Sequence, residues 1–142
     1  MLSIVVLACY LACAAWLGSS VYRADENAAR GRRIAGQGLG AVAVVLHAVL
    51  LWQSVFSKPT LAFTAAETAS LIGWPTGCIA LVLTSLRPRF AGISSILMAV
   101  AGVVAALTVE ETAGYALEQQ SWEIAAHIVL STLAYALLTI AV

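Results

Sequence analysis

The sequence predicts an all-α integral membrane protein, a bundle of five transmembrane helices. Of its 142 residues 62% are hydrophobic, whereas soluble domains are roughly 45–50% apolar. Seven basic and seven acidic side chains are all the charges it carries, and nearly all of them lie in four short gaps between five apolar stretches. Each stretch has the length of about 20 residues that an α-helix needs to cross the hydrocarbon layer of a bilayer.

The five stretches are 2–22, 34–56, 62–86, 91–109 and 124–142. They are too long for barrel strands, and they lack the strict alternation of polar and apolar residues that such strands show. Because backbone groups in lipid must be hydrogen-bonded within their own segment, five helices explain the pattern best. We expect a single transmembrane domain over residues 1–142.

The two ends of the chain carry expectations of their own. Stretch 2–22 has no basic region before it and is too long for the apolar part of a signal peptide, so we expect it to be retained as a helix. The last stretch runs to Val142 without a flanking charge. We therefore expect the chain to be the N-terminal part of a longer protein.

Basic residues are concentrated in the first and third gaps, which predicts the orientation. Cytoplasmic loops are enriched in Lys and Arg, so these two gaps face the cytoplasm and the N-terminus lies outside. We expect a multi-pass protein of the bacterial inner membrane, with no surface organised for nucleic acid. The charged residues of the four gaps, in order, are Arg23, Asp25, Glu26, Arg30, Arg32 and Arg33; Lys58; Arg87 and Arg89; and Glu110, Glu111, Glu118 and Glu123.

Small residues recur within the stretches. Gly36 and Gly40 form one GxxxG pair and Gly73 and Gly77 another, a spacing that lets helices approach closely in lipid. Pro75, inside the second pair, removes a backbone hydrogen bond and favours a kink. Cys9, Cys13 and Cys78 lie in apolar stretches without CxxC or CxxCH spacing, so we expect buried packing thiols.

Three ionisable residues lie within the predicted helices: His47, Glu67 and His127. Ionisable groups in a bilayer cost a few kcal/mol each by insertion scales, so each requires a reason. All three fall in the outer half of the predicted membrane. A neutral imidazole is the form that binds a metal.

Two histidines on separate helices are candidate axial ligands for haem b, with the bundle interior as the apolar wall. Trp122 is a candidate face for the porphyrin ring, and Glu67 a candidate to orient a ligating imidazole. The alternative is that His47 and His127 hydrogen-bond neighbouring helices and bind no cofactor. The residues alone leave both interpretations open.

The segment that begins at Trp122 resembles the cytochrome c assembly protein family, the CcsA-, CcmC- and HemX-like haem-handling membrane proteins. Its pattern is W-x4-H-x3-S-x3-Y-A, in which the histidine is His127. The segment 61–74, with Glu67, is similar in outline to a family segment that opens a helix after an outer loop. His47 resembles the second-helix histidine of the YpjD-type inner-membrane branch.

This resemblance implies a membrane factor that binds or exports haem for the maturation of c-type cytochromes. It implies that His127 ligates haem iron near the outer face, and that other maturation proteins and an apocytochrome are partners. The family's tryptophan-rich motif, its second outward histidine and its later membrane histidine are not found in this sequence. Such a factor needs no bond-making residue of its own, so we expect haem delivery rather than enzymatic catalysis.

Two other functions compete with this one. A cofactor-free accessory or regulatory subunit of a transporter requires the histidines only for packing. A proton or cation pathway through Glu67 and the histidines is weaker, because no ionisable group lies in the inner half of the membrane.

Overall fold

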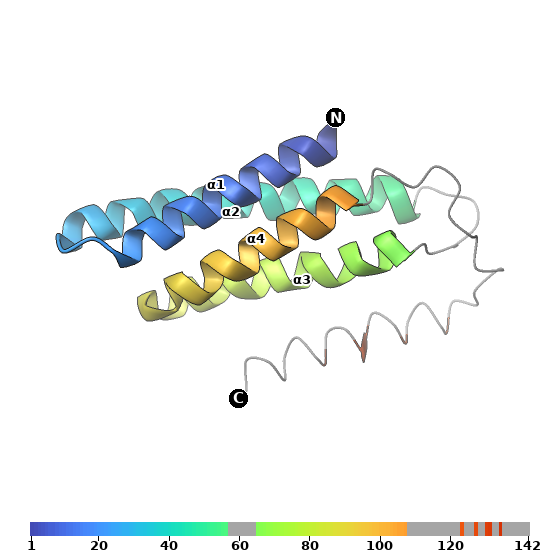
Figure 1. Ribbon diagram of the computed structural model, residues 1–142. Coiled ribbons are helices and arrows are strands. Elements are labelled where there is room, and N and C mark those ends of the chain that lie inside the picture. The colour runs from blue at the N-terminus through green and yellow to red at the C-terminus, as the bar shows by residue number, and fades with distance from the viewer. Residues whose placement is uncertain (57–64, 108–122, 124–126, 128–129, 132–133, 135–142) are drawn as a thin grey trace.

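The protein is an antiparallel bundle of helices in the computed structural model, which describes residues 1–56 and 65–107 together with five residues of a later segment, 123, 127, 130, 131 and 134 (Figure 1). The elements are α1 Leu2–Val21, α2 Glu26–Leu51, the short π-helix η1 Trp52–Phe56, α3 Ala65–Leu86, the 3₁₀ turn η2 Pro88–Phe90 and α4 Ala91–Leu107. No strand occurs among the described residues.

The predicted helices are confirmed for four of the five stretches. Helices α1 and α3 and the helical segments Glu26–Ser54 and Pro88–Leu107 are each long and apolar enough to cross a membrane. The fifth stretch, 124–142, lies almost entirely outside the described residues. The side of the membrane on which the N-terminus lies stays a prediction.

Helix α2 begins at Glu26, whereas the hydropathy pattern predicted a start at 34. The Asp25 side chain caps the helix by accepting a hydrogen bond of 3.0 Å from the backbone N–H of Asn27, and Glu26 places a negative charge in the first turn. Both features stabilise a helix N-terminus. The prediction was wrong here because apolar length detects the part of a helix in the membrane, not a polar turn that projects beyond it.

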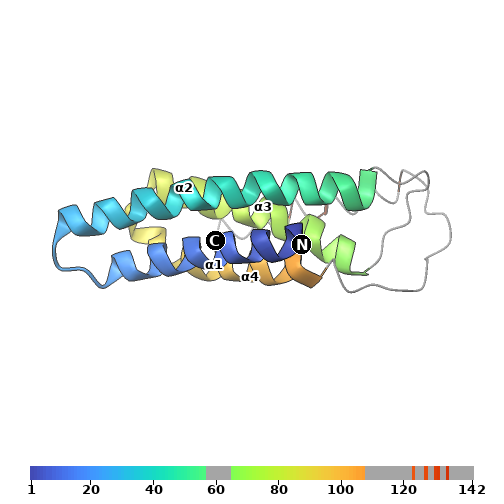
Figure 2. The same cartoon turned by 90° about the horizontal axis from the view of Figure 1, so that it is seen from above.

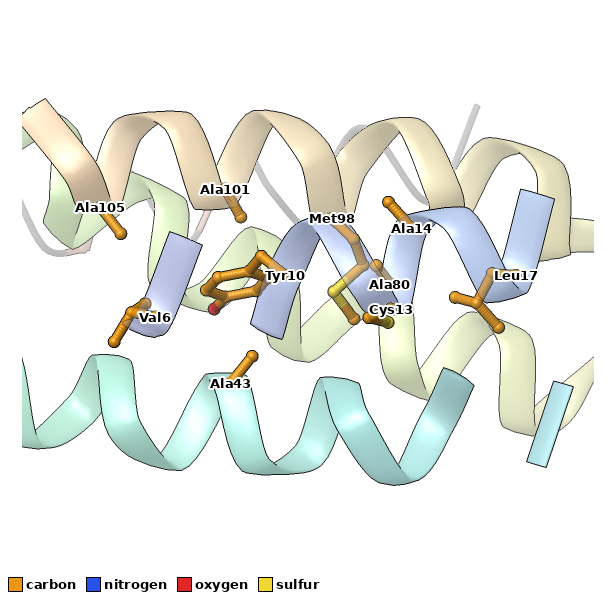
Figure 3. Close-up of a cluster of buried hydrophobic side chains, with 10 residues drawn as sticks. All are labelled: Val6, Tyr10, Cys13, Ala14, Leu17, Ala43, Ala80, Met98, Ala101 and Ala105. Carbon is orange, nitrogen blue, oxygen red and sulfur yellow. The ribbon is translucent and has the colours of Figure 1, made fainter. Parts of the chain in front are cut away.

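The four helices form a closed ring in which each packs against its neighbours in the chain, and α1 also packs against α4 (Figure 2). Their connections place the α1–α2 and α3–α4 turns at one end, which we call the arginine end. The core runs along the middle of the ring (Figure 3). Its fully or nearly fully buried residues are Val6, Tyr10, Cys13, Ala14 and Leu17 of α1, Ala43 of α2, Ala80 of α3, and Met98, Ala101 and Ala105 of α4.

Glycines bring α1 close to both of its neighbours. A Cβ added at Gly36 of α2 would lie 3.0 Å from Leu17 Cδ2. One added at Gly40 would lie 2.9 Å from Cys13 Sγ and 2.7 Å from Leu81 Cδ2 of α3. On α4, a Cβ at Gly102 would lie only 2.6 Å from the Cβ of Tyr10. The Gly36–Gly40 pair therefore has the packing role that the sequence predicted.

Helix α3 contains Pro75 near its middle, between the two glycines of the second pair. Gly73 faces α4, where an added Cβ would meet Val104 Cγ1 at 3.3 Å, and a Cβ added at Gly77 would lie 2.8 Å from the hydroxyl oxygen of Tyr10. Because proline has no N–H, the backbone bond to the carbonyl of Leu71 is missing. The half of α3 before Pro75 is therefore joined less firmly to the half after it.

Candidate functional site

His47 is completely buried at the point where α2 faces both α1 and α3. Its Nδ1 lies 3.1 Å from the hydroxyl oxygen of Tyr10, and its Nε2 lies 2.8 Å from the hydroxyl oxygen of Ser70. The Tyr10 and His47 rings meet edge to face, with centroids 5.7 Å apart and planes at 90°. One imidazole thus links three helices through hydrogen bonds.

Either neutral tautomer of His47 satisfies these contacts. A neutral imidazole has one N–H donor and one acceptor nitrogen, and a hydroxyl group can serve as the partner of either. Tyr10 and Ser70 are themselves completely buried and cannot bond to water. The hydrogen bonds among Tyr10, His47 and Ser70 take the place of those that water would make. While both bonds are in place, neither nitrogen of His47 is available to a metal.

Glu67 lies one turn before Ser70 on the same face of α3, and only 4% of its surface is exposed. The sequence predicted that Glu67 would orient a ligating imidazole. The described contact from α3 to His47 is made by Ser70. Glu67 is therefore a buried neighbour of the polar cluster, and its orienting role stays a prediction.

Hydrogen bonds join α2 to α3 along much of their length. The Trp74 indole Nε1 donates to the backbone carbonyl of Val44 at 3.0 Å, and Gln37 Nε2 donates to Ser85 Oγ at 3.2 Å. Together with the His47–Ser70 contact, these bonds span the pair from near the arginine end to the depth of His47. Polar side chains thus contribute much of the contact between α2 and α3, whereas glycines allow the close approach of α1 to α2 and α4.

The second predicted ligand, His127, has a different environment. Its side chain is exposed, and its Nε2 lies 3.4 Å from the hydroxyl oxygen of Ser131, one turn later. This distance is longer than the usual 2.7–3.2 Å of an N···O hydrogen bond, so the contact is weak. The structure does not bring His127 to His47, whose two nitrogens contact Tyr10 and Ser70. Trp122 lies outside the described residues.

The described residues contain no group of three or more His, Cys, Asp and Glu side chains placed to hold a metal ion. Cys9, Cys13 and Cys78 are free thiols, and Cys13 lies in the core between α1, α2 and α4.

Tyr10 and Ser70 are the site residues that the sequence did not predict. Each carries a detectable signal, because Tyr10 is a polar aromatic residue in the middle of an apolar stretch and Ser70 lies one turn from Glu67. The sequence does not show that Tyr10 and Ser70 both contact His47. Their contact with His47 depends on which helix faces meet in the bundle, and no periodicity along one stretch contains that information.

Neither a protein-family model, nor a curated protein, nor a solved structure matches this chain. The resemblance to the cytochrome c assembly family thus depends on the residues of this sequence alone.

Proposed function

We propose that this chain is a haem-binding membrane factor in c-type cytochrome biogenesis, with His127 as an axial ligand of the iron. The observation that carries the proposal is the exposed ring of His127, whose contact among the described residues is a long one of 3.4 Å to Ser131 of its own segment. The surrounding residues are predominantly apolar, and an imidazole there is costly without a strong partner. Haem iron is such a partner, and imidazole is one of its standard ligands.

The two histidines fit this role differently. His127 is accessible to an external ligand as it stands. His47 fits as a second ligand only after it gives up Ser70 or Tyr10. Because the α2–α3 contact depends on hydrogen bonds and the Pro75 interruption lies close to Ser70, release of Ser70 is the easier of the two changes. The absence of CxxCH spacing in the sequence is consistent with non-covalent haem b.

In this role the protein binds and orients, and the cofactor supplies the reactive groups. Haem contributes the vinyl groups to which thiols of an apocytochrome add. His127 holds the iron, Trp122 offers a flat apolar face, and the apolar helices exclude water. The expected partners are other maturation proteins of the bacterial inner membrane and the apocytochrome.

A second candidate function is a cofactor-free accessory subunit of a transporter. The fully hydrogen-bonded state of His47 favours it, because both ring nitrogens already have partners within the bundle. This function predicts that replacing either histidine by Ala changes only packing.

Visible spectroscopy distinguishes the two functions. We expect the protein, expressed with abundant haem and purified in detergent, to show a Soret band and sharp bands on reduction. His127→Ala should remove these bands, whereas Ser131→Ala, which changes only the neighbour of the ring, should keep them. A colourless wild-type protein, or a spectrum that His127→Ala leaves intact, would contradict haem ligation by this residue.

A further inference from the structure

One face of α2 directs two arginines toward the α3–α4 turn. Arg30, Arg33 and Gln37 are three and four residues apart, so they share a face of the helix. The hydrogen bond of 3.2 Å from Gln37 to Ser85 turns that face toward the end of α3. The chain then continues directly into Arg87 and Arg89.

Four like charges therefore lie at the arginine end, two near the start of α2 and two at the α3–α4 turn (Figure 1). Arg30, Arg87 and Arg89 are exposed and Arg33 is partly buried. Arg89 lies over the Phe90 ring, with its guanidinium carbon 5.1 Å from the centroid. Within the part of the chain that the structure describes, none of the four forms an ion pair with a carboxylate.

The other two arginines of this end are arranged differently. Arg32 donates to Ser19 Oγ at 3.0 Å and so faces α1, and Arg23 is exposed in the turn that follows α1. Of the two acidic residues at this end, Asp25 caps α2, and Glu26 lies one turn before Arg30 on α2. An anion bound among the four gathered arginines would relieve their mutual repulsion.

Apolar side chains beside the arginines indicate what kind of anion fits. Ile34 adjoins Arg33 on α2 and is 58% exposed, while Leu86 adjoins Arg87 on α3 and is 70% exposed. Val82, one turn before Leu86, is 56% exposed. A free phosphate would use only the arginines. A phospholipid would contact both the arginines and the apolar residues, with its phosphate on the arginines and its acyl chains along the apolar side chains.

We infer that Arg30, Arg33, Arg87 and Arg89 form a binding site for the headgroup of an anionic phospholipid, between the first turns of α2 and the α3–α4 turn. The site is independent of haem binding. It fastens the arginine end to the anionic leaflet and bridges α2 to α3 at the opposite end from the N-terminus.

Lipid titration by native mass spectrometry tests this site. The purified protein in an uncharged detergent is titrated with phosphatidylglycerol and, separately, with phosphatidylcholine. We expect tighter binding of phosphatidylglycerol, weakened by salt. The double variant Arg33→Gln/Arg87→Gln should bind it roughly 25-fold more weakly, as about fivefold for each arginine. Arg33→Lys/Arg87→Lys should retain most of the binding, which separates charge loss from misfolding.

The matched control is Arg23→Gln/Arg32→Gln, which removes the same charge from the same end. It should weaken phosphatidylglycerol binding far less than the first double variant. Equal weakening by both variants would overturn the site, because only the total charge of this end would then matter. Equal binding of phosphatidylcholine, or displacement of the lipid by millimolar inorganic phosphate, would overturn it as well.

Discussion

Helix α2 is joined to its two neighbours by different means. Against α1 it presents Gly36, where an added Cβ would lie 3.0 Å from Leu17 Cδ2. Gly40 lies close to side chains of both neighbours, Cys13 of α1 and Leu81 of α3. Two hydrogen bonds also join α2 to α1, Arg32 to Ser19 and His47 to Tyr10. Against α3 it presents hydrogen-bonding groups, at Gln37, at the Val44 carbonyl and at His47. Since lipid supplies no hydrophobic force between helices, packing and hydrogen bonds are the two available sources of association.

The difference determines which contact can change. A glycine contact is a property of the backbone and is lost only when two helices separate. A hydrogen bond between side chains can be exchanged when one rotamer rotates. His47 has a hydrogen bond to each neighbour, but α1 also packs closely against α2 at Gly36, so α1 is expected to stay in place while α3 exchanges its contact. We expect the following variants to separate the two kinds of contact.

The largest effect is expected for His47→Ala. The substitution leaves a cavity and deprives two buried hydroxyl groups, those of Tyr10 and Ser70, of their shared partner. We expect a loss of about 3–5 kcal/mol in the free energy of unfolding. Reversible unfolding in mixed micelles measures it. A loss below about 1 kcal/mol would mean that the cluster does not join the three helices.

Gly102→Ala tests the glycine contact on the other side of α1. The new Cβ would lie 2.6 Å from the Cβ of Tyr10, an atom next to the backbone that cannot rotate away. We expect a destabilisation of about 1–3 kcal/mol. The control is Gly38→Ala, where nothing lies within 4 Å of the added atom. Because alanine favours a helix over glycine, this control should stabilise α2 by up to about 1 kcal/mol.

The two glycine variants are therefore expected to change the free energy of unfolding in opposite directions. The difference between their unfolding midpoints, measured under one protocol, shows how close the contact between α1 and α4 is. If both variants stabilise the protein equally, α1 and α4 are farther apart than the described packing.

Ser70→Ala removes one of the two partners of His47 and keeps the helix backbone. We expect a destabilisation of about 1–2 kcal/mol, because the imidazole Nε2 is left buried without its partner. Ser85→Ala, on the same helix, is the comparison: it removes the acceptor of an exposed hydrogen bond from Gln37, which water can replace, and should cost less than about 0.5 kcal/mol. Equal effects of the two variants would indicate that the His47–Ser70 bond contributes nothing specific.

Trp74→Phe is expected to have the smallest effect. It removes the indole N–H that donates to the Val44 carbonyl and keeps an aromatic ring in a half-buried position. Hydrogen bonds between membrane helices average about 0.6 kcal/mol, and we expect a loss of this order plus a small packing term. The same unfolding assay measures this loss. A loss above about 2 kcal/mol would show that the contact between α2 and α3 depends on the Trp74 bond more than on Ser70.

Much of the fold follows from the sequence for a physical reason. Spans of about 20 apolar residues are imposed by the thickness of the bilayer, so four helices were predicted near their observed positions. The start of α2 was not predicted. Arg30 and Arg33 lie in polar first turns of the helix, which the capping residue Asp25 specifies but which hydropathy does not detect. The Gly36–Gly40 spacing predicted a packing face but not the partners, which are α1 at Gly36 and both α1 and α3 at Gly40.

The candidate site was predicted in part. His47 was selected because an imidazole within an apolar stretch needs a partner, and the structure supplies two. Their identities, Tyr10 and Ser70, depend on the rotation of three helices about their axes. The side chain of His127 is exposed in the described residues, and the apolar surroundings expected for it stay a prediction. Its haem-binding role is still a proposal.

Chemical rescue at position 127 tests the central claim most directly. His127→Gly removes the imidazole and leaves space for a free imidazole molecule from solution. We predict that the variant, purified from haem-rich cells, lacks the Soret and reduced α-bands, and that adding haem with millimolar imidazole restores them. A His127→Gly protein that keeps the wild-type spectrum, or one that imidazole does not restore although its helical circular dichroism is unchanged, would contradict axial ligation by His127.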